Sequence, residues 1–359
     1  MLHSSIWGAV PVILPGGNLG VTVFFVLSGF LITTLLLDEH GGTGQIDLRA
    51  FYLRRAARLL PGMLVLLPIY VLIFSHQQSP LQLLETVGPT LLYLSSFVQA
   101  IWGAMGPLGW TWSLSVEEHF YVCWPPLLRW LLNGAGTGRR GARGRLRRHP
   151  LMLASAIAAL IVAAATVLRV AVTGSPHGNQ FAYYSTFTRI DALAVGCLAA
   201  LIGHRRRSRL PPAAGWAALL VIGWCYLNPA FSIGHSALNL YGLPVCTVAA
   251  AILTLTVVNQ PLGRLSRMLS FRPLVHLGTV SYGLYLWNLL PGQTWHLISG
   301  RHAGTLGTIC CFVVMVVAVE LSYWYVERPV LRWAKSRLAG SSRGLVGAPL
   351  RVLSGARSG

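Results

Sequence analysis

The chain has 359 residues, of which 54% are hydrophobic and only 10% are charged. Its mean hydropathy of +0.60 excludes an ordinary water-soluble globule and favours a protein that uses the lipid bilayer as solvent. The formal net charge of +19 comes from arginines in a few loops and the tail, apart from the aromatic residues, so we expect contact with membrane lipid and no binding of nucleic acid.

Apolar stretches of roughly membrane-spanning length recur along the chain. They cover residues 19–37, 59–75, 86–104, 113–132, 152–172, 187–203, 213–228, 240–258, 274–298 and 305–326. These stretches predict an all-α, polytopic bundle of membrane helices. The chain therefore divides into a membrane domain, residues 1–338, and a basic, Gly/Ser-rich tail, residues 339–359, that is expected to be disordered in the cytoplasm.

Arginine clusters mark the cytoplasmic loops under the positive-inside rule. They lie at 49–58, 139–148, 204–209 and 264–272 and in the tail. These loops fall on one face only if one apolar stretch does not cross, and the Gly/Pro-flanked stretch 86–104 is the best candidate for a re-entrant segment. The prediction is about nine spans plus this segment, with residues 1–18 outside, the C-terminus inside and Arg301 as the one outer-loop exception.

A carboxylate inside an apolar segment costs free energy unless another group or water solvates it, so Glu117 is expected to have a structural or functional role. At helical spacing Glu117 shares a face with Ser113, Tyr121 and Trp124. Glu117 is either a structural carboxylate that bonds a neighbouring side chain or a group that orients a catalytic base. Both alternatives stay open on spacing alone.

Two further charged groups, Arg189 and Asp191, enter a later span from the outer side. They are too close in sequence to face each other on a helix, so each is expected to have its partner on another span. A structural ion pair is the simpler explanation, and Glu117 with Arg189 is a plausible one.

The segment FYLRRAARLLPG at 51–62 carries Arg54, Arg55 and Arg58 at the predicted cytoplasmic surface. On a helix, Arg54 or Arg55 and Arg58 share a face, where they could hold the phosphates of a nucleotide-bearing donor. Plain anchoring of a membrane helix explains the same pattern.

Six motifs in order make the chain resemble the acyltransferase 3 family of membrane proteins. They are GGNLGVTVFFVLSGFLIT at 16–33, FYLRRAARLLPG at 51–62, WTWSLSVEEHFYVCWP at 110–125, RIDALAVG at 189–196, VSYGLYLWN at 280–288 and SYWYVERPVLRW at 322–333. The resemblance implies ten membrane helices and transfer of an acyl group, commonly acetyl, from acyl-CoA to a sugar hydroxyl. The nine predicted spans then indicate that the family's first helix is missing, and we expect the true start to lie upstream of Met1.

The resemblance also implies roles for individual residues. His3 takes the place of the family's outer histidine and becomes the general base, with Glu117 as the carboxylate that holds its tautomer. Arg54, Arg55 and Arg58 are expected to bind the donor. The core of the site is expected to contain Ser113, Tyr121, Arg189, Asp191, Tyr282, Trp287 and Asn288.

Three departures from the family pattern affect this transfer of roles. Thr22 stands where the family usually has Asp, His119 where it usually has Gln, and Asn288 where His is common. Because an amide cannot take up a proton, Asn288 cannot serve as a base.

The sequence therefore predicts a multi-pass O-acyltransferase of the inner (plasma) membrane that modifies a carbohydrate or a glycosylated acceptor. Acyl-CoA is expected as cosubstrate, with no metal and no bound cofactor. The alternatives are a proton-coupled transporter or flippase, in which Glu117, Arg189 and Asp191 form an ion relay, and an inactive truncated relative.

Overall fold

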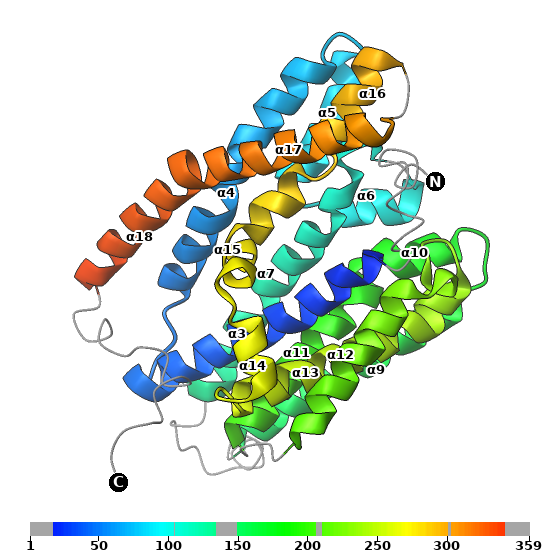
Figure 1. The fold of residues 1–359 in the computed structure, drawn as a ribbon. Coiled ribbons are helices and arrows are strands. Elements are labelled where there is room, and N and C mark those ends of the chain that lie inside the picture. Colours follow the sequence, from blue (N-terminus) through cyan, green and yellow to red (C-terminus); the bar gives the residue numbers. More distant parts are fainter. Residues whose placement is uncertain (1–16, 104, 134–148, 206–209, 301–302, 342–359) are drawn as a thin grey trace.

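The computed structural model describes residues 17–103, 105–133, 149–205, 210–300 and 303–341. Throughout this described part the secondary structure is helical, and the helices pack side by side into a bundle (Figure 1). The all-α class predicted from the sequence is thus confirmed.

The long helices follow the predicted apolar stretches closely. They are α3 (Gly20–Thr43), α4 (Leu48–Phe74), α7 (Trp112–Asn133), α9 (Pro150–Val172), α11 (Thr186–Arg205), α12 (Pro212–Leu227), α13 (Leu243–Asn259), α15 (Arg272–Trp287) and α17 (Thr305–Ser322). Shorter elements join them: η1 (Gly17–Leu19), α5 (Pro80–Leu91), α6 (Ser95–Trp102), η2 (Gly106–Thr111), α10 (Gly178–Tyr184), η3 (Pro229–Phe231), η4 (Leu238–Gly242), α14 (Arg264–Leu269), α16 (Leu290–Ser299), η5 (Tyr323–Glu327) and α18 (Arg328–Ser341).

Within the described part, six helical segments are long and apolar enough to cross a membrane. They are Gly17–Thr43, Leu48–Phe74, Pro150–Val172, Gly178–His204, Leu238–Asn259 and Thr305–Arg337. The 22-residue helix α7 is not among them, although the sequence predicts a span there. Its polar residues are compatible with a helix that protein surrounds on most sides, since most of its side chains are buried.

Two predicted stretches are interrupted. Residues 86–104 form parts of α5 and α6, of 12 and 8 residues, so this stretch is not a single crossing helix. Residues 274–298 are divided at Asn288 into α15 and α16, and Pro291 lies in the first turn of α16. Irregular backbone at membrane depth is tolerated where protein or a cavity surrounds it, so this break is a place to look for function.

Helix α4 begins eleven residues earlier than the apolar stretch that predicts it. The Asp47 side chain caps the helix by accepting a hydrogen bond from the Ala50 amide, which satisfies one of the free N–H groups of the first turn. The arginine-rich residues 49–58 are therefore the first turns of α4 and not a loop. The arginine cluster and the buried apolar residues of α4 therefore belong to one continuous helix.

Helices α3 and α11 pack at very short range through two glycines. A Cβ atom at Gly29 would lie 2.0 Å from the Leu193 carbonyl oxygen, and one at Gly196 would lie 2.1 Å from that of Val26. Small residues allow two membrane helices to approach this closely, and dispersion contacts then hold them together.

Helix α7 separates two clusters of buried apolar side chains. The first core joins α3, α9, α11, α12 and α13 and includes Phe25, Ile32, Trp124 and Leu193. The second core joins α4, α15 and α17 and includes Met63, Tyr70, Leu286 and Val319. Because α7 contributes Val116 and Phe120 to the first and Leu114 to the second, its polar residues lie where the two cores meet.

Candidate active site

The polar face of α7 brings Glu117 to the boundary between the two cores. Its carboxylate is 4% exposed and accepts a hydrogen bond of 3.2 Å from the hydroxyl of Tyr121, one helical turn further along. The same tyrosine hydroxyl bonds Ser28 of α3. Ser28, Tyr121 and Glu117 therefore form one buried polar chain that links α3 to α7.

Arg55 approaches this chain from α4. Its guanidinium carbon lies 4.3 Å from the centre of the Tyr121 ring, a distance at which a cation is attracted to the ring face. Arg55 acts electrostatically on both Glu117 and Glu118, and Arg58 acts on Glu117. No direct ion pair joins these arginines to Glu117 or Glu118, so in this structure they act on the carboxylates through space.

A third carboxylate, Glu327, belongs to the same region. It is 5% exposed, accepts a hydrogen bond of 3.1 Å from Ser322, and feels the charge of Arg58. Its Oε1 atom lies close to Gly62 of α4 and Gly283 of α15, where a Cβ would come within 3.4 and 3.7 Å. Glu327 thus lies where α4, α15 and η5 converge.

Of the predicted core residues, Ser113 and Tyr121 do lie near Glu117. The Ser113 hydroxyl is 2.6 Å from the hydroxyl of Tyr285 on α15, which also donates to the Trp110 carbonyl oxygen. Because Glu117 acts electrostatically on Tyr285, these groups share one polar region. The chain of hydroxyls extends this region from α7 to α15.

Tyr282 and Trp287 lie on α15, and Asn288 follows its last residue. Tyr282 donates a hydrogen bond of 2.6 Å to the Leu59 carbonyl oxygen, which joins α15 to α4. Trp287 Nε1 and Asn288 Oδ1 are buried and have no hydrogen-bond partner. They lie at the break between α15 and α16, so a buried donor and a buried acceptor are both unmet where the helix is interrupted.

Arg189 does not pair with Glu117, so that predicted ion pair is wrong. Its Nη2 donates a hydrogen bond of 2.8 Å to the hydroxyl of Thr22 on α3. Its guanidinium group lies 5.3 to 5.8 Å from the ring centres of Phe25, Trp112 and Tyr183. A neutral hydroxyl and three aromatic rings therefore take the place of a carboxylate partner, which helps explain how Thr22 is accommodated at this position.

Asp191 pairs with Arg169 of α9, at 2.5 Å between Oδ2 and Nη1. Both side chains are at least 95% buried, and Arg169 also donates to the Thr188 carbonyl oxygen. The prediction that Arg189 and Asp191 find partners on different helices is confirmed. This ion pair fixes α9 to α11 and lies apart from the Glu117 chain, on the first-core side of α7.

Arg54, a predicted donor-binding residue, points away from this cluster. Its Nη2 lies 3.6 Å from Glu39 of α3, so it forms a surface ion pair. His3, the predicted base, lies outside the described residues. Among the residues that the structure does describe, no group of His, Cys, Asp and Glu side chains could hold a metal ion.

Sequence reasoning missed Glu327, Arg169 and Ser28. Glu327 follows the apolar stretch 305–326 by one residue, and a helix drawn slightly longer would have included it. Arg169 is the one charged residue in the stretch 152–172, a signal as strong as that of Glu117. Ser28 gives no such signal, since a hydroxyl in a membrane helix can bond its own backbone.

This arrangement can position and polarise the groups of a ligand. Buried carboxylates can hold an imidazole or a hydroxyl in one orientation, and nearby guanidinium groups can bind anionic parts of a ligand.

The sequence profile of the acyltransferase domain family, acyltransferase 3, matches residues 2–325. "Putative peptidoglycan O-acetyltransferase YrhL" of Bacillus subtilis is 31% identical over 88% of this chain and 50% of its own length. The peptidoglycan O-acetyltransferase OatA of Listeria monocytogenes and the O-acetyltransferase OatA of Staphylococcus aureus are each 27% identical, over 88% of this chain and 51% and 53% of theirs. No solved structure matches the chain.

The chain thus spans about half the length of the curated relatives it matches. The profile covers α3 to α17, including the Ser28–Tyr121–Glu117 chain, and ends two residues before Glu327. This match shows that the chain belongs to the acyltransferase 3 family, as its motifs predict, and the apolar helices agree with a multi-pass membrane protein.

Proposed function

We propose that the protein transfers an acetyl group from acetyl-CoA to a hydroxyl of a cell-wall carbohydrate. The observation that carries this proposal is the buried chain Ser28–Tyr121–Glu117 with Arg55 stacked on Tyr121. It places a carboxylate beside a cation at the junction of two helix groups, inside the region that the family profile matches. The names of the relatives support O-acetyl transfer, and those of the Bacillus and Listeria proteins support peptidoglycan as acceptor.

In the proposed reaction, His3 removes the proton from the acceptor hydroxyl and Glu117 orients the imidazole and balances its charge. The hydroxyl oxygen then bonds the acyl carbon, the thioester C–S bond breaks, and the proton passes from the imidazolium to the leaving thiolate of coenzyme A. Arg55 and Arg58 hold the anionic donor. The balance is one O–C bond formed, one C–S bond broken and one proton moved.

We propose a cytoplasmic donor site and an outward-facing acceptor site. The distribution of arginines supports this orientation, with the start of α4 and the C-terminus on the cytoplasmic side of the plasma membrane. The break at Asn288, with its unmet donor and acceptor groups, suits the binding of carbohydrate hydroxyls.

A transporter or flippase remains the second candidate function. The buried ion pair Arg169–Asp191 is the feature that favours it, since charged pairs inside membrane bundles can relay protons. Transport predicts that no acetyl group is covalently transferred, whereas acyl transfer predicts a covalently acetylated product.

The test is acetyl transfer from radiolabelled acetyl-CoA to peptidoglycan in membranes that contain the full chain. We expect Glu117→Gln, which keeps the side-chain size, to lower kcat about 100-fold, and His3→Ala to lower it at least as much. Glu85→Gln, at an exposed position of α5, is the matched control and should leave kcat unchanged. Unchanged kcat in both Glu117→Gln and His3→Ala would remove the proposed mechanism.

A pH profile separates positioning from mere structural support by Glu117. If its carboxylate stabilises a protonated imidazole, Glu117→Gln should move the acid limb of kcat/KM to lower pH. A purely structural carboxylate would lower the rate at every pH and leave the limb in place.

A further inference from the structure

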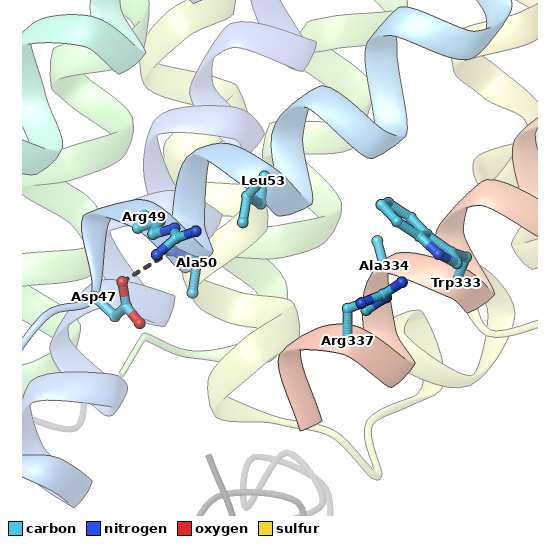
Figure 2. Close-up of a pocket in the computed structure, with 7 residues that line it drawn as sticks. All are labelled: Asp47, Arg49, Ala50, Leu53, Trp333, Ala334 and Arg337. Atoms are coloured by element: carbon cyan, nitrogen blue, oxygen red, sulfur yellow. Dashed lines mark hydrogen bonds between the residues drawn. The ribbon is translucent and has the colours of Figure 1, made fainter. Parts of the chain in front are cut away.

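A pocket of about 270 Å³ lies between the first turns of α4 and the last turns of α18. Asp47, Arg49, Ala50 and Leu53 form its α4 wall, and Trp333, Ala334 and Arg337 its α18 wall (Figure 2). None of these residues belongs to the predicted donor or acceptor site, and the pocket is distinct from the Glu117 chain.

The chemistry of the two walls suits a nucleotide. Arg49 and Arg337 supply guanidinium groups from opposite sides, and such groups bind phosphates through paired hydrogen bonds. The Trp333 indole is 58% exposed, and the Arg337 guanidinium lies 5.7 Å from its ring centre. An exposed indole with a cation beside it and a second cation on the opposite wall offers a surface on which a purine ring can stack.

Asp47 explains why a purine fits better than an anionic lipid headgroup. One of its oxygens caps α4 through the Ala50 amide. The remaining acceptor capacity of the carboxylate suits an amino group, such as that of adenine, and would repel a phosphate placed directly against it. A phosphate is therefore expected near Arg337 and Arg49, and the base near Trp333.

The position of the pocket on α4 connects it to the candidate active site. Arg49 lies nine residues before Arg58, a distance of about 14 Å along the helix axis. Arg55 lies between them and reaches the Tyr121 ring. An extended donor could thus have its nucleotide in the pocket and its thioester end directed along α4 toward Glu117.

We infer that the α4–α18 pocket binds the adenosine 3′,5′-bisphosphate end of the acyl-CoA donor. This inference rests on the proposed acyl transfer, because it identifies where that donor is held. It assigns donor binding to Arg49, Trp333 and Arg337 in addition to the arginines in the middle of α4.

The test is calorimetric binding of adenosine 3′,5′-bisphosphate to the full chain in phosphatidylcholine nanodiscs. We expect Arg49→Gln and Arg337→Gln each to weaken binding about tenfold, and Trp333→Ala to weaken it by a similar factor. Lys335→Gln, which removes a charge from α18 outside the pocket, is the matched control and should bind as the wild type does. Absence of binding by the wild type, or equal affinity in all variants, would overturn the inference.

The donor kinetics distinguish this inference from the proposed function. If acetyl transfer occurs while Arg49→Gln and Arg337→Gln leave the KM for acetyl-CoA unchanged, the function stands and the pocket assignment fails. If the bisphosphate binds as expected but no acetyl group is transferred, the pocket assignment stands and the function fails. Dependence of phosphatidylglycerol binding on Arg49 and Arg337, together with no binding of the bisphosphate, would assign the pocket to an anionic lipid headgroup and overturn the inference.

Discussion

The two cores on either side of α7 differ in where their unmet buried polar atoms lie. In the first core, Trp124 Nε1 donates a hydrogen bond of 2.9 Å to Thr33, and Arg169 forms its ion pair with Asp191, although the Nε atoms of Arg169 and Arg189 have no hydrogen-bond partner. In the second core, the indole nitrogens of Trp110 and Trp287 are buried without a partner. Asn288 Oδ1 and Gln293 Oε1, at the adjoining helix break, are also unmet.

Three of the unmet atoms of the second core, on Trp287, Asn288 and Gln293, lie at one helix break. Unmet donors and acceptors cost free energy in the empty protein, and this cost is recovered when a ligand or water bonds them. We therefore expect a ligand or water at the break between α15 and α16, whereas the buried charged groups of the first core are held by partners on neighbouring helices.

The largest expected effect comes from the close approach of α3 and α11. Gly29→Ala places a Cβ against the Leu193 carbonyl and forces the two helices apart along their contact. We expect a loss of about 4 to 5 kcal/mol in the free energy of unfolding, or no folded protein. The measurement is thermal unfolding of the purified protein in detergent.

Gly41→Ala, on the same helix, is the control for this substitution. A Cβ there meets no atom within 4 Å, so we expect unchanged or slightly raised stability from the better helix propensity of alanine. Equal melting temperatures for the two variants would show that the close approach of α3 and α11 does not contribute to the stability of the first core.

The buried ion pair gives the next largest effect. Arg169→Met leaves Asp191 charged and unpaired in the first core, so we expect a loss of about 3 kcal/mol in stability. Arg54→Gln breaks the surface pair with Glu39 and should cost less than about 1 kcal/mol, because water and salt screen that pair. When denaturation is repeated at a second salt concentration, the stability loss of Arg54→Gln should change and that of Arg169→Met should not.

The smallest expected effect comes from replacing one tryptophan in each core. Trp124→Phe removes a hydrogen bond and leaves the buried Thr33 hydroxyl with one partner fewer, so we expect a stability loss of about 1 to 2 kcal/mol beyond the change in ring size. Trp287→Phe removes an indole N–H that has no partner and should change stability less. Contact of Trp287 with the acceptor predicts that Trp287→Phe raises the KM for the acceptor while stability changes little.

The apolar stretches predict the helices of the described part well, because a membrane helix needs a long run of apolar residues. The two interruptions were harder: the Gly/Pro residues around 86–104 indicated a break, whereas Pro291 did not prevent 274–298 from being drawn as one span. Apolar length alone also placed the start of α4 too late, since its first turns are arginine-rich.

The candidate site could be predicted only in part. Glu117 and Tyr121 lie one turn apart on one helix, so spacing alone places them together. The partners Ser28, Thr22 and Arg169 come from other helices, and their pairing depends on how those helices cross. That crossing is set by backbone contacts at glycines, which a pattern of apolar residues does not encode.

The π-helical turn η5 governs the direction in which the side chains of α18 face. Such a turn holds one residue more than an α-helical turn, so it rotates α18 by about 100° about its axis. Residues 323–327 therefore orient the Trp333 indole and the Arg337 guanidinium toward the start of α4. Deleting a single residue there would swing both groups a quarter turn away without touching either of them.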